Sequence, residues 1–143
     1  MAQFAEVNIN GKILRLVEAD DNDIVNNGGH QSEQAAKNFE KTLPLLSNEN
    51  KWVESSSTDE FRGRPASLGG TYDSSSNVFI SIKPYSSWVL DQNKNWVSTI
   101  PYPNNEEGIS NIFWDEDNIR WLGYDSEIVK YEWNKNTLTW IVL

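Results

Sequence analysis

An aromatic residue, a short polar turn and a second aromatic residue seven or eight positions further on recur in the second half of the chain. The pairs are Tyr72 with Phe79, Trp88 with Trp96, Trp114 with Trp121, and Trp133 with Trp140. Asp, Asn and Ser fill the turns, and they tolerate turn geometry because they bond to their own backbone. A separation of seven places two rings opposite each other across a four-residue loop, with Cβ atoms about 4.5–5.5 Å apart. The pattern predicts a series of aromatic-clamped hairpins over residues 71–143.

Two features modify this series. Trp88 and Trp96 are separated by eight positions, so their rings face the same side only across a loop of odd length or a bulge. Proline-containing stretches around Tyr85 and Tyr102 lack a donor for a β-ladder and predict edges or corners. The last run, 140–143, is apolar, and we expect it to be buried in this domain or against another subunit.

The first half of the chain predicts different elements. Residues 3–18 read as a hairpin around Asn10-Gly11, and the polar stretch 20–29 reads as a loop. Apolar residues at helical spacing predict one short helix over 32–43, with Ser32 as its N-cap. A strand follows at 51–54.

These elements predict a mainly β (α+β) fold of antiparallel hairpins or a meander, with one short helix near residues 32–43. A length of 143 residues fits a single domain, 1–143. Within it we expect an N-terminal hairpin, helix and strand over 1–54, a loop over 55–70 that is extended or mobile, and the aromatic hairpins over 71–143.

Composition excludes several classes of function. The chain has no cysteine, which removes disulfides and thiolate chemistry, and one histidine, His30, which removes most transition-metal sites. The net charge of −9 argues against nucleic-acid binding. No apolar run approaches the roughly 20 residues that span a bilayer, and the first residues lack the pattern of a signal peptide. We therefore expect no cofactor, no membrane insertion, and synthesis in the cytoplasm of the producing cell.

Residues 70–103 carry a string of motifs: Gly-Thr-Tyr-Asp, Val-Phe-Ile, Lys-Pro-Tyr-Ser-Ser-Trp-Val-Leu-Asp, Trp-Val and Ile-Pro-Tyr-Pro. They resemble a family of small proteins of marine tailed phages, cyanophages in particular. The opening residues 1–5, the segment 32–34, the pair 52–53 and the pair 61–62 resemble it as well. The resemblance covers most of residues 1–122. The family ends with one Trp-Asp…Trp hairpin, so the hairpin between Trp133 and Trp140 looks like an added copy.

The resemblance implies a phage-encoded protein and a virion component, made in the host cytoplasm and carried in the particle. Its implied partner is a larger phage structural protein of the capsid or tail, with self-association as a further contact. The resemblance carries over no catalytic residue, and we expect no enzyme. The sequence leaves open the choice between head and tail.

The residues most suited to contacting a partner are aromatic or basic. They are Trp88, Trp96, Trp114, Trp121, Trp133, Trp140, Tyr85, Tyr102, Arg62 and Arg64. The tryptophans form either sugar-stacking platforms or cross-strand core and protomer contacts, and we favour the second because large apolar patches rarely stay exposed. The two arginines either dock on an acidic neighbour or belong to a plain polar loop.

Other groups are less suited to chemistry. Asp115, Glu116 and Asp117 resemble a short set of oxygen ligands, but a calcium loop needs more of them, so a plain turn is favoured. His30 has no partner motif beside it, which favours a solvated side chain. The acidic pairs 20–21 and 106–107 could serve glycoside hydrolysis only in a cleft that holds two acids, and without a supporting constellation a solvated face is favoured.

Three functions follow from these observations. The first is a virion structural or accessory protein that decorates the head or attaches to the tail, held by aromatic and β-edge contacts. The second is a carbohydrate-binding module for host-surface glycans, and the third is a cytosolic phage effector that binds a host protein.

Overall fold

The structure is a computed structural model that describes residues 2–104 and 108–143. The chain divides into two compact units: an N-terminal unit, Met1–Ile82 with Gln92–Asn95, and a C-terminal unit, Lys83–Asp91 with Trp96–Leu143. The sequence predicts a single domain with internal boundaries at 54 and 70, whereas the two units meet in the chain between Ile82 and Lys83 and on either side of Gln92–Asn95. Each has its own hydrophobic clusters, which is why each is compact. The fold is mainly β with antiparallel sheets, as the sequence predicts.

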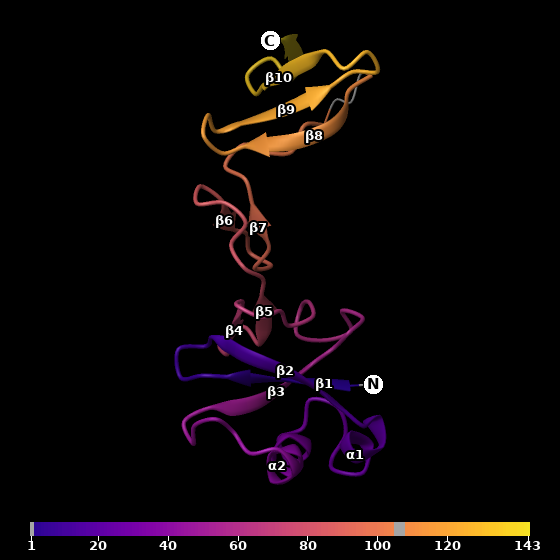
Figure 1. Ribbon diagram of the computed structural model, residues 1–143, viewed down its shortest axis with the longest axis vertical. Helices are drawn as coiled ribbons and strands as arrows, with labels where there is room; N and C mark the ends of the chain where they lie inside the picture. The colour runs from indigo at the N-terminus through magenta and orange to yellow at the C-terminus, as the bar shows by residue number, and fades with distance from the viewer. Residues whose placement is uncertain (1, 105–107) are drawn as a thin grey trace. The chain divides into compact units, whose positions relative to one another are not determined.

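A three-stranded antiparallel sheet forms the centre of the N-terminal unit (Figure 1). It contains β1 (Ala2–Val7), β2 (Ile13–Ala19) and β3 (Lys51–Ser55), in the order β2-β1-β3. The predicted hairpin and the predicted strand at 51–54 are both confirmed. The turn between β1 and β2 needs Gly11, whose φ is +83° and whose added Cβ would lie 2.7 Å from the Tyr72 carbonyl oxygen.

Two helices cover one face of this sheet: α1 (Asp21–Val25) and α2 (Glu33–Thr42). The predicted helix and its Ser32 cap are confirmed, since Ser32 Oγ accepts a hydrogen bond from the Ala35 N–H. The prediction of a loop over 20–29 was wrong in part. Asp20 caps α1, a helix of five residues that is too short to show helical periodicity in the sequence.

The opposite face of the sheet is covered by the hairpin of β4 (Thr71–Asp73) and β5 (Val78–Ile80). Alternation along β1 explains the two faces, because Phe4 joins the cluster under the helices while Ala5 joins the cluster that contains Phe79. Residues 56–70 form no strand, but they are ordered by the chain itself. The Ser55 hydroxyl accepts from the buried Ala66 N–H at 2.7 Å, so of the two alternatives for this loop, extended or mobile, the structure favours an ordered, extended loop.

The C-terminal unit contains a four-stranded antiparallel meander with the order β11-β10-β9-β8 (Figure 1). Its strands are β8 (Ser110–Asp115), β9 (Arg120–Tyr124), β10 (Lys130–Asn134) and β11 (Thr139–Val142). A two-stranded ladder of β6 (Val89–Leu90) and β7 (Trp96–Val97) precedes the meander in the chain. No helix in the described part of the chain is both long enough and apolar enough to cross a bilayer.

The aromatic pairs separated by seven residues lie directly opposite each other, as predicted. Tyr72 pairs with Phe79, Trp114 with Trp121, and Trp133 with Trp140, and their ring centroids lie 5.2, 5.1 and 5.2 Å apart. Each of these hairpins has a four-residue loop, since the next pair inward closes the ladder.

The Trp88 and Trp96 pair does not form. The register pairs Val89 with Val97 and Leu90 with Trp96, so Trp88 falls before β6 and has no partner in the ladder. Its ring packs instead against Trp114 and Trp121, with centroids 6.1 Å from each. The extra loop residue shifts the register, and burial in the tryptophan cluster decides where the ring goes.

Candidate interaction surfaces

The tryptophans of the meander form a hydrophobic core, so most of them are not accessible to a partner. Trp114, Trp121 and Trp133 are each 6% exposed and form one cluster, with Trp88 and Trp140 packed against it. Their rings meet at steep angles of 56–76°, the edge-to-face geometry that aromatic side chains prefer. A flat sugar-stacking platform needs an open ring face, and these three rings have none.

The remaining aromatic candidates lie nearer the surface. Tyr85 and Tyr102 are exposed, but each also rests on the cluster, at 5.2 Å from Trp88 and 5.1 Å from Trp121. Trp96 is half-buried, with Lys83 Nζ 5.4 Å from its ring centroid. These three side chains can contact a partner without leaving their places.

Arg62 and Arg64 hold the N-terminal unit together. Arg62 donates to the Glu54 carbonyl oxygen at 2.9 Å and to Asn77 Oδ1 at 3.0 Å. Arg64 donates to the Phe79 carbonyl oxygen, and also to the carbonyl oxygen of Asn93 at 2.9 Å. Both guanidinium groups therefore brace the segment 56–70, a role that the sequence does not reveal because the acceptors lie up to 31 positions away.

β11 is an edge strand of the C-terminal meander, and its apolar side chains are exposed. Ile141, Val142 and Leu143 are 48, 59 and 56% exposed, so the expected burial of this run within the domain does not occur. No strand lies beyond β11 in the described residues. An exposed apolar edge of this kind invites another chain to add a strand.

The opposite edge of the meander, β8, is irregular. The pairing with β9 shifts register between Ser110 and Phe113, and Asn111 has a φ of +49°. A bulge of this kind twists an edge and blocks pairing with another chain. The C-terminal unit thus offers one edge for strand addition and protects the other.

No family model, curated protein or solved structure matches this chain. The resemblance to proteins of marine tailed phages, and everything it implies, therefore stays a prediction.

His30 has a partner that the sequence hides. Its Nδ1 lies 2.6 Å from Glu54 Oε2, and Glu54 also accepts from the Gln31 N–H at 2.7 Å. The hydrogen bond to Glu54 raises the pKa of His30, and the charges of Glu54, Asp21 and Glu60 add to this effect against a smaller opposing effect of burial. The His30 side chain is 50% exposed, as expected, but it also has a partner that no neighbouring motif shows, because Glu54 lies 24 positions away in the chain.

The acidic candidates are occupied by neighbouring groups. Asp115 binds Arg120 at 2.8 Å, while Glu116 accepts from the Trp114 indole N–H at 2.7 Å and from Ser87 at 2.8 Å. Asp20 caps α1, and residues 106–107 lie outside the described residues. Within residues 2–104 and 108–143, no three Asp, Glu or His side chains gather in a way that could hold a metal ion.

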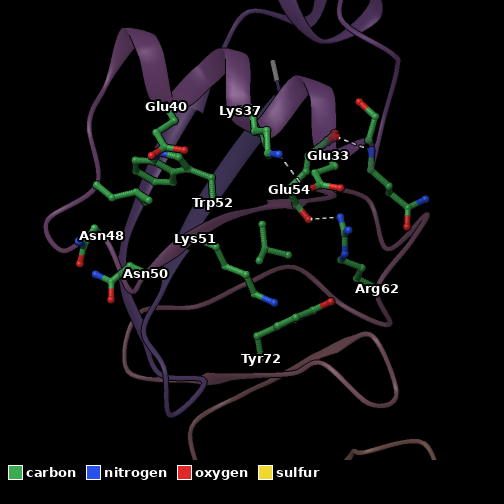
Figure 2. A pocket seen from close by; sticks show the side chains of 15 residues that line it. Glu33, Lys37, Glu40, Asn48, Asn50, Lys51, Trp52, Glu54, Arg62 and Tyr72 are labelled. Carbon is green, nitrogen blue, oxygen red and sulfur yellow. Dashed lines mark hydrogen bonds and ion pairs between the residues drawn. The ribbon is translucent and has the colours of Figure 1, made fainter.

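A groove of about 420 Å³ lies in the N-terminal unit, lined by residues of β3, α2 and the segments around Arg62 and Tyr72 (Figure 2). Its volume is within the range of about 300–1,000 Å³ that ligand sites occupy. The sequence patterns do not predict this groove, because its lining residues come from elements that are distant in the chain.

Proposed function

We propose that this protein is a non-catalytic structural or accessory protein of a phage particle, attached to a larger capsid or tail protein through the outer edge of β11. The exposed apolar edge carries this proposal. The phage setting comes from the sequence resemblance alone, and the mode of attachment comes from the geometry.

The β11 edge suits attachment for two reasons. Its outer side has no neighbouring strand in the described residues, and Ile141 and Val142 have exposed side chains, so a strand from a partner gains ladder hydrogen bonds and buries apolar surface together. The tryptophan cluster lies directly behind it, because Trp140 of β11 packs on Trp133 with centroids 5.2 Å apart. The edge is thus held rigid by the core, which lowers the entropy lost on binding.

The geometry favours attachment over glycan binding. Sugar recognition by stacking needs exposed and coplanar aromatic faces, whereas the three central tryptophans turn their faces to each other. The aromatic surface is used for cohesion within the unit.

Quantitative mass spectrometry of purified particles of the encoding phage tests the biological setting. We expect the chain at a fixed copy number per particle, comparable with other structural proteins. Its absence from the particles, while present in infected cells, would contradict the virion role and favour the effector alternative.

The mode of attachment is tested with Ile141→Lys combined with Val142→Lys. Lysine on an edge strand opposes strand addition, and both positions are exposed, so stability should change by less than about 0.5 kcal/mol per site. Incorporation into particles should fall at least tenfold. The matched control is Leu46→Lys, a lysine placed at a 68% exposed leucine of the N-terminal unit, which should leave incorporation unchanged.

A further inference from the structure

We propose that the groove beside β3 binds an extended peptide, which adds to the N-terminal sheet as a fourth strand and places acidic side chains against Lys51 and Arg62. This site belongs to the N-terminal unit and does not depend on attachment through β11 or on a phage setting.

The first observation is the free edge of β3. The sheet order β2-β1-β3 leaves β3 without a neighbour on its outer side in the described residues. Arg62 donates to the Glu54 carbonyl oxygen, which places that carbonyl on the side away from β1 and fills one of its two acceptor positions. In an antiparallel strand the N–H and C=O of one residue point to the same side and successive residues alternate. Trp52, two residues before Glu54, therefore also turns its backbone groups toward the groove.

The second observation is the space beside that edge. The groove of about 420 Å³ runs between β3 and α2 and is closed on its other side by Arg62 and Tyr72. Figure 2 shows Glu33, Lys37 and Glu40 projecting from α2 along one side, with Lys51, Arg62 and Tyr72 on the other. An edge strand beside a helix is a common arrangement for capturing an extended peptide.

The third observation is the difference in charge between the two walls. The wall formed by Lys51, Arg62 and Tyr72 contributes two cations and no carboxylate to the groove lining, and Lys51 Nζ lies 5.3 Å from the Tyr72 ring centroid. On the helix wall, Lys37 is paired with Glu33 at 3.2 Å, Glu40 adds a carboxylate that disfavours acidic residues on this side, and Ala36 and Leu45 add apolar surface.

These walls define the occupant. Side chains of an added strand alternate between the two walls. Residues that face Lys51 and Arg62 gain from a negative charge, whereas residues that face Ala36 and Leu45 gain from being small and apolar. The fitting ligand is an extended peptide in which acidic and small apolar residues alternate.

The test uses the full chain labelled with ¹⁵N and the capped hexapeptide Glu-Val-Glu-Val-Glu-Val. We expect saturable shifts of the amide signals of Trp52 and Glu54, and an affinity that calorimetry can measure. Two peptides serve as controls: one with lysine in place of glutamate, and one with proline in place of the first two valines. Proline lacks the backbone donor that a ladder needs, so both control peptides should bind at least tenfold more weakly.

Two variants locate the site. Lys51→Glu should weaken binding of the acidic peptide at least tenfold, and Lys51→Ala should weaken it less. Lys51 is exposed, so neither change should unfold the sheet, and we expect the amide signals away from β3 to stay unchanged in both variants. The matched control is Lys130→Glu, an exposed lysine that begins β10 of the C-terminal unit, which should leave affinity unchanged.

Several results would overturn the proposal. These are no binding up to millimolar peptide, equal binding of the proline-containing or lysine-containing peptide, and binding that Lys51→Glu leaves intact. Shifts of the β3 amides that appear on concentrating the protein alone would make a second copy of this chain the occupant and would also overturn it.

Discussion

Two glutamates of the N-terminal sheet, Glu6 and Glu54, have almost no exposed surface, and hydrogen bonds reach both oxygens of each carboxylate. Glu6 is 0% exposed and accepts from Arg15 Nε at 2.6 Å, from the Leu46 N–H at 2.7 Å and from Asn50 Nδ2 at 2.6 Å. Burial alone raises the pKa of Glu6, but the hydrogen bonds from Asn50, Leu46 and Arg15 outweigh it and lower the pKa below its ordinary value. The carboxylate thereby ties β1 to β2 and to the segment before β3.

Glu54, the second of these glutamates, makes stability depend on pH through His30. The pKa of His30 is raised in the folded protein by the Glu54 hydrogen bond. A group with a raised pKa stabilises the fold fully below its unfolded pKa, here about 6.5, and the contribution is lost as pH rises through the folded pKa. We expect His30→Gln to reduce the free energy of unfolding more at pH 5.5 than at pH 9, with a difference below about 1 kcal/mol for this half-exposed pair.

Urea unfolding of both proteins at the two pH values measures this difference. Lys37→Gln serves as a control, because it removes an ion pair that is exposed on both sides and leaves the His30 contact with Glu54 in place. An equal effect of His30→Gln at both pH values would mean that the Glu54 contact does not hold the imidazolium.

Ile119 occupies a backbone position that its side chain disfavours. It is the last loop residue of the hairpin between β8 and β9, and its φ is +51°. A left-handed conformation costs a non-glycine residue about 1–2 kcal/mol, and a β-branched side chain is especially unsuited to it. Leu138 lies at the equivalent place in the next hairpin, with a φ of +54°.

We expect Ile119→Gly to stabilise the C-terminal unit by about 1 kcal/mol, since glycine adopts this conformation without strain. Ile119 is exposed, so little packing is lost. Thermal unfolding measures the gain, and Ile119→Ala, which keeps a Cβ, should recover less of it. Destabilisation by glycine would show that the isoleucine side chain contributes more than its backbone costs.

The hairpins of the meander were predictable because their information is local. A polar turn between aromatic residues seven positions apart fixes the loop length, and the loop length fixes the register, as Trp114 with Trp121 and Trp133 with Trp140 show. The cap and periodicity of α2 are local in the same way. Trp88 was placed wrongly because its position depends on burial against β8 and β9, which no local pattern encodes. For the same reason, the sequence could not predict the groove beside β3 or the hydrogen-bond partners of His30, Arg62 and Arg64.

Gly123 allows β9 to pack closely against Ile109 and Trp140, because it has no side chain. A Cβ at this position of β9 would lie 2.5 Å from Ile109 Cγ2 and 3.3 Å from the Trp140 ring. Both neighbours are packed, so the sheet has little room to move. We expect Gly123→Ala to cost about 1–3 kcal/mol, the usual range for overpacking.

A double-mutant cycle with Ile109→Ala isolates the cause. Removing Ile109 Cγ2 takes away the closest clash, so the double variant should lose less stability than the sum of the two single variants. Additive losses would indicate that the cost comes from the backbone of β9 and not from the contact with Ile109.

The described residues form three hydrophobic clusters, two in the N-terminal unit and one in the C-terminal unit. The clusters under the helices and under β4 and β5 contain only residues of the N-terminal unit, whereas the tryptophan cluster contains only residues of the C-terminal unit. Both helices and Trp52 belong to the N-terminal unit, and the other six of the seven tryptophans belong to the C-terminal unit. Helical circular dichroism and tryptophan fluorescence therefore report mainly on different units.

We expect the two signals to follow different unfolding transitions, each sensitive to its own core. Glu6→Gln replaces an acceptor of three hydrogen bonds by a group that brings its own donors. Breaking a fully buried ion pair costs about 3–5 kcal/mol, and because Arg15 is 26% exposed we expect the lower end of this range. The substitution should lower the transition seen by circular dichroism by at least about 10 °C, since 1 kcal/mol shifts the midpoint of a 60–100-residue unit by about 4–8 °C. Trp133→Ala, which costs about 3–5 kcal/mol in a buried core, should lower the fluorescence transition and leave the helical signal in place. If either substitution moved both transitions together by the same amount, the two units would have to unfold as one cooperative body.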